Sequence, residues 1–176
     1  PDIHCQSRLK KLGANIKIFN SILESVDIEE CDKFDIIFIN SVIEHPFSIN
    51  TFFNKLNKIL NDNGIVVLVD MHCNGLDIQT LRENAPNVNI YSILQIGSIK
   101  GVKTLSENNG FIMKDVFSIG EMDTDIIYEY LKDMENSHPL KGLEKILEKD
   151  DVRKDLQALL SKHLLTGYNG YIFQKK

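Results

Sequence analysis

The sequence lacks the features that mark secreted and membrane-spanning proteins. Its 176 residues contain only three cysteines, Cys5, Cys31 and Cys73, and their odd number and irregular spacing do not indicate a disulfide framework. No apolar run is long enough to cross a bilayer, and no signal-peptide pattern follows Pro1. We therefore expect a cytoplasmic protein with reduced thiols and no membrane partner.

Basic residues are too few and too scattered to form a nucleic-acid-binding surface. The chain has 20 lysines and arginines against 25 aspartates and glutamates, which gives a net charge of -5. Because no basic stripe is present, we expect no nucleic-acid partner. The hydrophobic share of 43% is ordinary for a globular protein. No repeat or linker divides the chain, so we expect residues 1–176 to form a single domain.

Histidine and cysteine also fail to form a metal-binding pattern. The pairs His4-Cys5 and His72-Cys73 are adjacent in sequence, and on an extended strand neighbouring side chains point to opposite faces. No C-x-x-C or H-x-x-x-H spacing supplies a chelate. We therefore expect no metal site.

Two apolar runs joined by a helix organise the chain. Residues 36–39 and 65–69 are continuous apolar runs rich in β-branched side chains, so we expect parallel strands buried on both faces. Between them an apolar stripe recurs at helical spacing: Ile49, Phe52, Phe53, Leu56, Ile59 and Leu60. Ser48 can cap this helix, and a turn over residues 61–64 is expected to end it. The pattern predicts a βαβ unit of an α/β fold.

The position of these strands predicts where a ligand would bind. In open α/β sheets, ligands lie beyond the carboxyl ends of the strands, which here are residues 40–45 and 70–73. His45 titrates near neutral pH, so it is a candidate general base for a substrate hydroxyl. The alternative is that it packs at the strand end and hydrogen-bonds the backbone. Glu44 is expected to orient neighbouring groups.

Residues 33–68 resemble the second half of a class I S-adenosylmethionine-dependent methyltransferase. The segments that match the family's "FDxV", "EH" and "LxxxLxxGGxLxI" patterns are Lys33-Phe34-Asp35-Ile36-Ile37, Ile43-Glu44-His45 and Leu56-x-x-Ile59-Leu60-x-x-x-Gly64-Ile65-Val66-Val67-Leu68. A further match, Leu105 to Phe111, is similar to the segment that precedes the family's sixth strand. The resemblance implies a Rossmann-like sheet, mostly parallel with an antiparallel last strand, with strands near Asn15, Phe34, Gly64, Phe111 and Tyr168.

The resemblance also implies S-adenosylmethionine as the cofactor, and it assigns cofactor contacts. Ile22 and Leu23 match the turn after the family's third strand, where an apolar pair encloses the adenine; the alternative is that both are core residues. Asn40 and Ser41 stand at the end of the "FDxV" strand, beside the expected cofactor. The acid that would hold the ribose lies before Pro1 in this pattern. Asp2 is its possible substitute, although it could instead cap a helix.

The resemblance begins after the family's first βαβ unit. The chain opens at Pro1-Asp2 without an initiator Met, and none of its ten glycines forms a G-x-G-x-x-G loop. We therefore expect the carboxyl-terminal part of a longer enzyme, whose activity requires the amino-terminal part. The alternative is a degenerate, catalytically silent methyltransferase-like module that interacts with or regulates a partner.

The last third of the chain resembles a smaller set of these methyltransferases. Residues 118–127 and 156–176 resemble members associated with surface-polysaccharide and nucleotide-sugar biosynthesis, although residues 166–168 are Thr-Gly-Tyr where those members have Ser-Ser-His. This similarity implies a small hydroxylated or sugar-like acceptor as the small-molecule partner. Three apolar stripes predict a helical extension over about residues 119–165, before the last strand. Residues 74–78 are expected to form a turn, and residues 87–95 an irregular lid.

Overall fold

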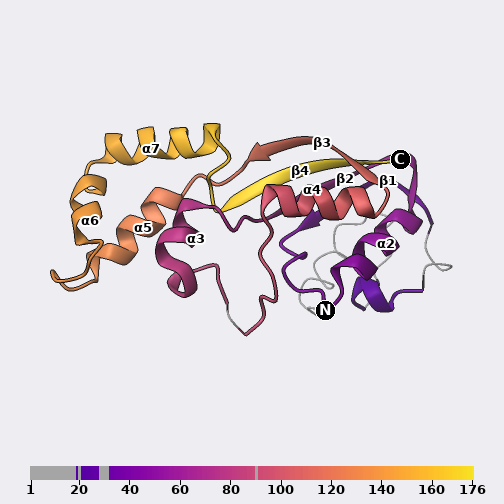
Figure 1. Ribbon diagram of the computed structural model, residues 1–176, viewed down its shortest axis with the longest axis horizontal. Helices are drawn as coiled ribbons and strands as arrows, with labels where there is room; N and C mark the ends of the chain where they lie inside the picture. Colours follow the sequence, from indigo (N-terminus) through magenta and orange to yellow (C-terminus); the bar gives the residue numbers. More distant parts are fainter. Residues whose placement is uncertain (1–18, 20, 28–31, 90) are drawn as a thin grey trace, which may run out of the picture.

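The computed structural model describes residues 19, 21–27, 32–89 and 91–176 (Figure 1). Their elements follow one another as η1 (Leu23–Ser25), β1 (Phe34–Asn40), α2 (Ile49–Ile59), β2 (Leu60–Met71), α3 (Leu76–Leu81), η3 (Arg82–Asn84), α4 (Ile99–Asn108), β3 (Phe111–Ser118), α5 (Asp123–Lys132), α6 (Lys141–Leu147), α7 (Asp150–Lys162) and β4 (Tyr168–Lys175). None of the described helices has the length and apolar character needed to cross a membrane.

The four described strands form one sheet in the order β1-β2-β4-β3. β1 and β2 are parallel, and β4 is antiparallel to both of its neighbours, so β3 runs in the same direction as β1 and β2. The predicted Rossmann-like sheet with an antiparallel last strand is confirmed. The strand expected near Asn15 lies outside the described residues.

Helices α2 and α4 cover one face of this sheet and close its core. Ser48 accepts a hydrogen bond from the backbone N–H of Thr51, which confirms it as the cap of α2. The ring of Phe53 meets the rings of Phe111 and Phe173 edge-on, at centroid distances of 6.1 and 6.2 Å. Val102 of α4 is buried in the same cluster. This aromatic core is built from segments that are far apart in the sequence.

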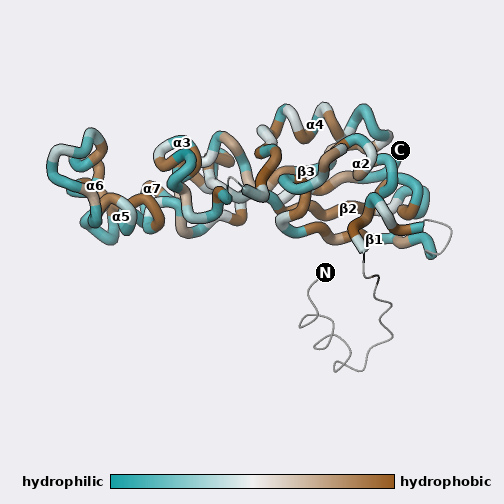
Figure 2. Tube along the Cα trace, turned by 90° about the horizontal axis from the view of Figure 1, so that it is seen from below, coloured by the Kyte–Doolittle hydropathy of each residue, from teal (hydrophilic) through white to brown (hydrophobic). Residues whose placement is uncertain are grey.

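The opposite face of the sheet is apolar and exposed, and the prediction of strands buried on both faces is wrong for β1. The side chains of Ile36 and Phe38 are 65% and 66% exposed, whereas Ile39 is buried. Side chains alternate along a strand, so these two share the face opposite to α2 and α4. No described helix covers that face of β1. Figure 2 shows the hydrophobic residues that run along β1 and β2.

Two expected turns are placed differently in the structure. β2 begins directly after α2, and the residues expected to form a turn become an irregularity in the strand, because Phe34 pairs with Leu60 and Ile36 with Ile65. Asn63 adopts a φ of 63°, the left-handed conformation that turn residues such as Asn tolerate. The turn expected over residues 74–78 is also wrong, since α3 already begins at Leu76.

A second core lies at the other end of the molecule, where Figure 1 shows α3, α5, α6 and α7 gathered away from α2. The three helices α5, α6 and α7 stand between β3 and β4. Their apolar stripes enclose a cluster with α3 that contains Ile78, Leu81, Ala85, Ile127, Leu131 and Leu147. Whether residues 1–176 fold as a single domain stays a prediction.

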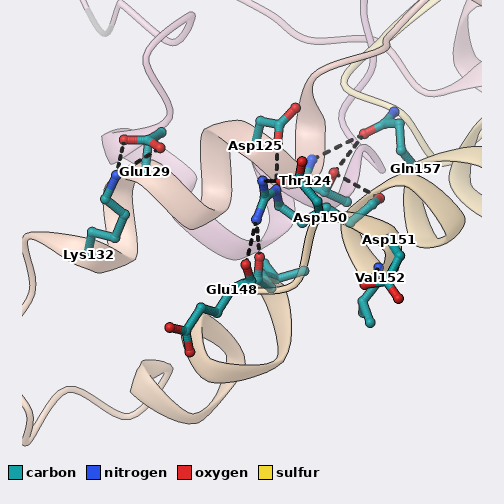
Figure 3. A network of polar contacts seen from close by, with 11 residues as sticks. Thr124, Asp125, Glu129, Lys132, Glu148, Asp150, Asp151, Val152 and Gln157 are labelled. Atoms are coloured by element: carbon teal, nitrogen blue, oxygen red, sulfur yellow. Dashed lines mark hydrogen bonds and ion pairs between the residues drawn. The ribbon is translucent and has the colours of Figure 1, made fainter.

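Polar contacts tie the helices of this second core together, and Figure 3 shows Asp125, Asp150 and Thr124 converging between α5 and α7. Arg153 donates to Asp125 Oδ1 at 2.7 Å and pairs with Asp150, while its guanidinium lies 4.6 Å from the ring centroid of Tyr128. Gln157 Oε1 accepts from the backbone N–H of Thr124 at 3.1 Å. These bonds fix α7 against α5.

Candidate functional site

The carboxyl ends of β1 and β2 lie side by side, as the sequence predicts. Asn40 is paired with Val69, and the backbone N–H of Ser41 donates to the carbonyl oxygen of Val69 at 2.9 Å. Ser41 then turns the chain with a φ of 51°, a left-handed conformation that is uncommon for residues other than glycine. Such backbone conformations gather at functional sites. The chain after β1 is thereby directed along the edge of the sheet, next to Asp70.

Asp70 holds the segment that follows β1. Its Oδ2 accepts from the backbone N–H groups of Val42 and Ile43 at 3.1 and 3.0 Å, and its Oδ1 accepts from Met71 at 2.8 Å. From the sequence, this orienting role is expected of Glu44. The structure gives it to Asp70, because the carboxylate at the end of β2 faces the N–H groups that the turn at Ser41 leaves unpaired.

Glu44 and Asp70 form a buried carboxyl pair. Both side chains are almost fully buried. Burial, the hydrogen bond with Glu44 and the negative charge of Glu44 together raise the pKa of Asp70 to about 7, against the lowering effect of the backbone donors. The carboxyl group of Asp70 therefore keeps its proton over much of the range below neutral pH.

His45 lies next to this pair with its ring half exposed. Its Nδ1 is 2.9 Å from the carbonyl oxygen of Ser92, and its Nε2 is 3.7 Å from Glu44 Oε1. A carbonyl oxygen only accepts, so Nδ1 carries a proton, and in the neutral ring Nε2 is then the basic atom. The backbone contact fits the packing alternative for His45, and the exposed Nε2 fits the catalytic one.

A pocket of about 340 Å³ brings His45 together with the two predicted adenine contacts. This Ile22 pocket is lined by Ser21, Ile22, Leu23, Glu24, Val42, His45, Pro46, Phe47 and Phe52. Ile22 is exposed in it, whereas Leu23 also packs against the sheet core, so the core alternative describes Leu23 better than Ile22. Lys55 fixes this wall, because its Nζ donates to the carbonyl oxygens of Leu23 and Val26 at 3.1 and 2.8 Å.

A second buried carboxyl pair lies where α3 and α5 meet the start of β4. Asp77 and Asp123 are both buried, and burial together with the charge of Asp123 raises the pKa of Asp77 to about 6. Asp123 accepts from the backbone N–H of Gly167 and, at 2.7 Å, from Gln157 Nε2. A Cβ at position 167 would lie 2.4 Å from Asp77 Oδ1. Only glycine fits beneath this carboxylate.

Tyr168 stands between the two carboxyl pairs. It opens β4 opposite Met71, because an antiparallel strand begins where its parallel neighbours end. Burial raises the pKa of Tyr168, the hydrogen bond with Ser41 lowers it, and the charges of Glu44, Asp70 and Asp77 raise it. A cavity of about 220 Å³, the Tyr168 pocket, is lined by Asp77, Asn87, Ile119, Gly120, Glu121, Met122, Asp123, Ile126 and Tyr168.

The predicted site residues thus fall into separate groups. Ile22, Leu23 and His45 share one pocket, Ser41 lies beside Tyr168, and Asn40 ends β1. Asp2 lies outside the described residues. His72 is buried, and burial lowers the pKa of its imidazole. Within the described ranges, no group of three or more His, Cys, Asp and Glu side chains is placed to hold a metal ion.

Three residues of the site are not expected from the sequence, whereas Asp70 lies in the range 70–73 that is expected to border a ligand and ends a buried apolar run there. Tyr168 had a signal, because the first residue of an antiparallel last strand must return to the carboxyl edge of the sheet. Asp77 and Asp123 had none, since they are far apart in sequence and meet only when α3 and α5 pack together.

Comparisons with known proteins find similarity in structure alone. No protein-family model matches the sequence. No curated protein matches it either. Among solved structures, a candidate S-adenosylmethionine-dependent methyltransferase from Listeria monocytogenes aligns with a TM-score of 0.60 and 11% identity over 99% of this chain and 77% of its own. A candidate sarcosine dimethylglycine methyltransferase from Galdieria sulphuraria aligns with a TM-score of 0.57 and 15% identity over 98% and 64%.

A third similar structure contains the product of the cofactor. It is the O-methyltransferase from a trans-AT PKS multienzyme of Brevibacillus brevis in complex with S-adenosyl-L-homocysteine, with a TM-score of 0.57 and 17% identity over 98% of this chain and 53% of that one. The chain therefore spans between about half and two thirds of the Brevibacillus and Galdieria proteins. Its sheet order, its antiparallel last strand and these alignments together show the fold of class I S-adenosylmethionine-dependent methyltransferases.

Proposed function

We propose that the chain is part of an enzyme that transfers a methyl group from S-adenosylmethionine to a small hydroxylated or sugar-like acceptor. The observation that carries the proposal is the Ile22 pocket, which lies beside the carboxyl end of β1 and contains His45. The sugar-like acceptor rests on the resemblance of residues 118–127 and 156–176 to methyltransferases of polysaccharide biosynthesis. From composition we also propose a cytoplasmic location and no nucleic-acid or membrane partner.

The residues of the Ile22 pocket fit the proposed cofactor. Ile22, Val42 and Phe47 present apolar side chains, which suit the flat faces of an adenine base. Asn40 and Ser41 offer polar groups at the adjoining strand end, where the ribose and the amino acid part would lie. When bound, S-adenosylmethionine supplies an electrophilic methyl group on a sulfonium. An acid for the ribose, proposed as Asp2 or as a residue that precedes it, completes this set.

The chain's own groups then position the acceptor and remove its proton. Asp70 fixes the backbone of Val42 and Ile43, so the segment that carries His45 is held rigidly beside the cofactor. His45 Nε2 is exposed and unprotonated in the neutral ring, so it can accept the proton of an acceptor hydroxyl. Methyl transfer depends mainly on in-line positioning, and a weak base is enough for it.

We further propose that activity requires a unit that precedes the described strands. Phe34, Ile36, Phe38 and Ile65 leave an exposed apolar face on β1 and β2, and β1 pairs with β2 alone among the described strands. A strand beside β1 and a helix on this face would bury that surface. The greater length of the Brevibacillus and Galdieria proteins agrees with this.

Cofactor binding tests the requirement for a preceding unit. Titration calorimetry of the 176-residue chain with S-adenosylmethionine should show weak or no binding, because no glycine-rich cofactor loop is among its residues. A protein extended at the amino terminus should bind it and release S-adenosylhomocysteine when an acceptor is present. Micromolar affinity of the 176-residue chain, about -8 kcal/mol, would contradict the requirement. Cofactor binding without transfer in the extended protein would favour the catalytically silent module.

Substitution of His45 tests its role in the extended protein. If Nε2 removes the acceptor proton, His45→Ala should lower kcat by about 10²–10⁴-fold, a larger effect than any loss of cofactor affinity, since His45 also lines the Ile22 pocket. The acidic limb of the kcat profile, which protonation of a general base produces, should disappear. His163→Ala is the matched control, because that imidazole is exposed beyond α7. A loss below about threefold, with the limb retained, would assign His45 to packing.

A further inference from the structure

The buried carboxyl groups around Tyr168 lack basic partners. Glu44, Asp70, Asp77 and Asp123 are each at most 3% exposed, yet among the described residues no lysine or arginine forms an ion pair with any of them. The basic group that the described residues place within 4 Å of these carboxyl groups is His45, at 3.7 Å from Glu44. Because a buried negative charge is costly unless it is paired, this cluster favours a positively charged ligand.

Among the described residues, each carboxyl pair has one buried oxygen without a hydrogen-bond partner, Glu44 Oε2 in one pair and Asp77 Oδ1 in the other. The oxygens of Asp70 accept three backbone N–H groups, and those of Asp123 accept from Gly167 and Gln157. In the described structure, Asp77 Oδ1 is buried and has no hydrogen-bond partner, and Asp77 lines the Tyr168 pocket together with Asp123. Asp77, which lines the Tyr168 pocket, therefore has an oxygen that can still accept a hydrogen bond.

The rest of the Tyr168 pocket suits a small organic cation. Ile119, Met122 and Ile126 give it apolar walls, and Glu121 adds a third carboxylate to its lining. Its volume of about 220 Å³ is below the range of about 300–1,000 Å³ that is typical of sites for whole drug-sized ligands. The pocket therefore has the size for one end of an acceptor. Apolar walls exclude water and strengthen the attraction between a carboxylate and a cation.

We propose that the Tyr168 pocket binds an ammonium group of the acceptor, so that the acceptor is a hydroxylated amine. The inference rests on the proposed function only in taking the occupant to be the methyl acceptor. Tyr168 supplies the connection, since it lines the pocket and its side chain hydrogen-bonds with Ser41 directly after β1. An acceptor held by its amine at Asp77 and Asp123 extends past Tyr168 towards the proposed cofactor site.

Ethanolamine and ethylene glycol are matched probes for this site. They are similar in size, but only ethanolamine carries an ammonium group at neutral pH. In a titration of the 176-residue chain followed by ¹⁵N–¹H NMR, ethanolamine should shift the amides of residues 119–126 and 168 in a saturable way. Ethylene glycol should require at least a tenfold higher concentration for the same shifts. Equal responses to the two probes, or no saturable response to ethanolamine, would overturn the proposal.

Variants locate the binding site. Asp77→Asn and Asp123→Asn keep the side-chain shape and should each weaken ethanolamine binding at least tenfold, whereas Asp155→Asn on the exposed face of α7 should not. Met122→Lys places a competing cation at the pocket from an exposed position and should have the same effect even if the aspartate variants fail to fold. Undiminished binding by Met122→Lys would overturn the proposal.

The titration separates this inference from the proposed function, because it requires neither cofactor nor methyl transfer. Saturable, ammonium-dependent binding supports the cation site whether or not methylation is later detected. In the extended protein, methylation of glycols but not of hydroxylated amines would overturn the inference and leave the proposed methyltransferase function intact.

Discussion

The sheet and the helical end of this molecule are stabilised in different ways. The sheet core combines aromatic side chains from α2, β3 and β4, and only one face of β1 is covered by described helices. The helical core is aliphatic and enclosed on several sides, with Ile127, Leu131 and Leu147 fully buried between α3, α5, α6 and α7. The helices of this end therefore bury their apolar stripes against one another. The sheet, in contrast, leaves an exposed apolar face on β1 that a further element could cover.

The two regions meet at the segment that leads into β4. The backbone N–H of His72 donates to the carbonyl oxygen of Gly167 at 2.8 Å, and the N–H of Gly167 donates to Asp123. A Cβ on Gly75 would lie 2.4 Å from Gly167 Cα, so these two backbones approach as closely as glycines allow. The contrast between the regions teaches that the candidate site lies at their junction, where a self-contained helical part closes on an open sheet.

The largest expected effect concerns the aromatic core. Phe53→Ala should lower the free energy of unfolding by about 3–5 kcal/mol, because it leaves a cavity between Phe52, Phe111 and Phe173. Urea unfolding followed by circular dichroism measures this loss. Phe47→Ala is the control, since Phe47 is exposed and should cost little. A loss below about 1 kcal/mol for Phe53→Ala would contradict the described sheet core.

The next effect is the pH dependence caused by the carboxyl pair of the sheet. The pKa of Asp70 is about 7 in the folded chain and 3.8 ordinarily, so the folded state binds more protons than the unfolded state between these values. The contribution of Asp70 to the free energy of unfolding should therefore fall as the pH rises from about 4 to 7, by at most roughly 1.4 kcal/mol per pH unit.

Asp70→Asn tests this slope. The variant should show a flatter decline of the free energy of unfolding over the same pH range, in urea titrations at several pH values. Asp155→Asn should keep the slope of the unsubstituted chain, because that carboxyl is exposed. Identical slopes for the chain and Asp70→Asn would show that Asp70 is not a proton-binding group in the folded state.

The smallest expected effect contrasts the two faces of β1. Phe38→Thr should change the free energy of unfolding of the 176-residue chain by less than about 0.5 kcal/mol, because Phe38 is largely exposed. Ile39→Thr, one residue further on and buried, should cost more than about 1 kcal/mol. Urea unfolding of both variants compares the faces. Similar losses at the two positions would mean that the exposed face is covered in solution.

Local sequence signals predicted most elements of the described fold. Ser48 caps α2 where a serine precedes an apolar stripe, and its side chain accepts the expected backbone N–H. The strand beginning at Phe111 follows Gly110, whose φ of 83° is readily adopted by glycine. These features were predictable because they depend on residues only a few positions apart.

The sequence by itself determined the apolar runs, the helix caps and the strand ends at which the site lies. It did not determine which side of a strand is covered, because Ile36 and Phe38 are as apolar as a buried residue and only the location of α2 and α4 decides their exposure. It also could not reveal the pair of Asp77 and Asp123. Their coupling exists because α3 packs against α5 and excludes water from both carboxyl groups, and burial of this kind is a property of the tertiary structure alone.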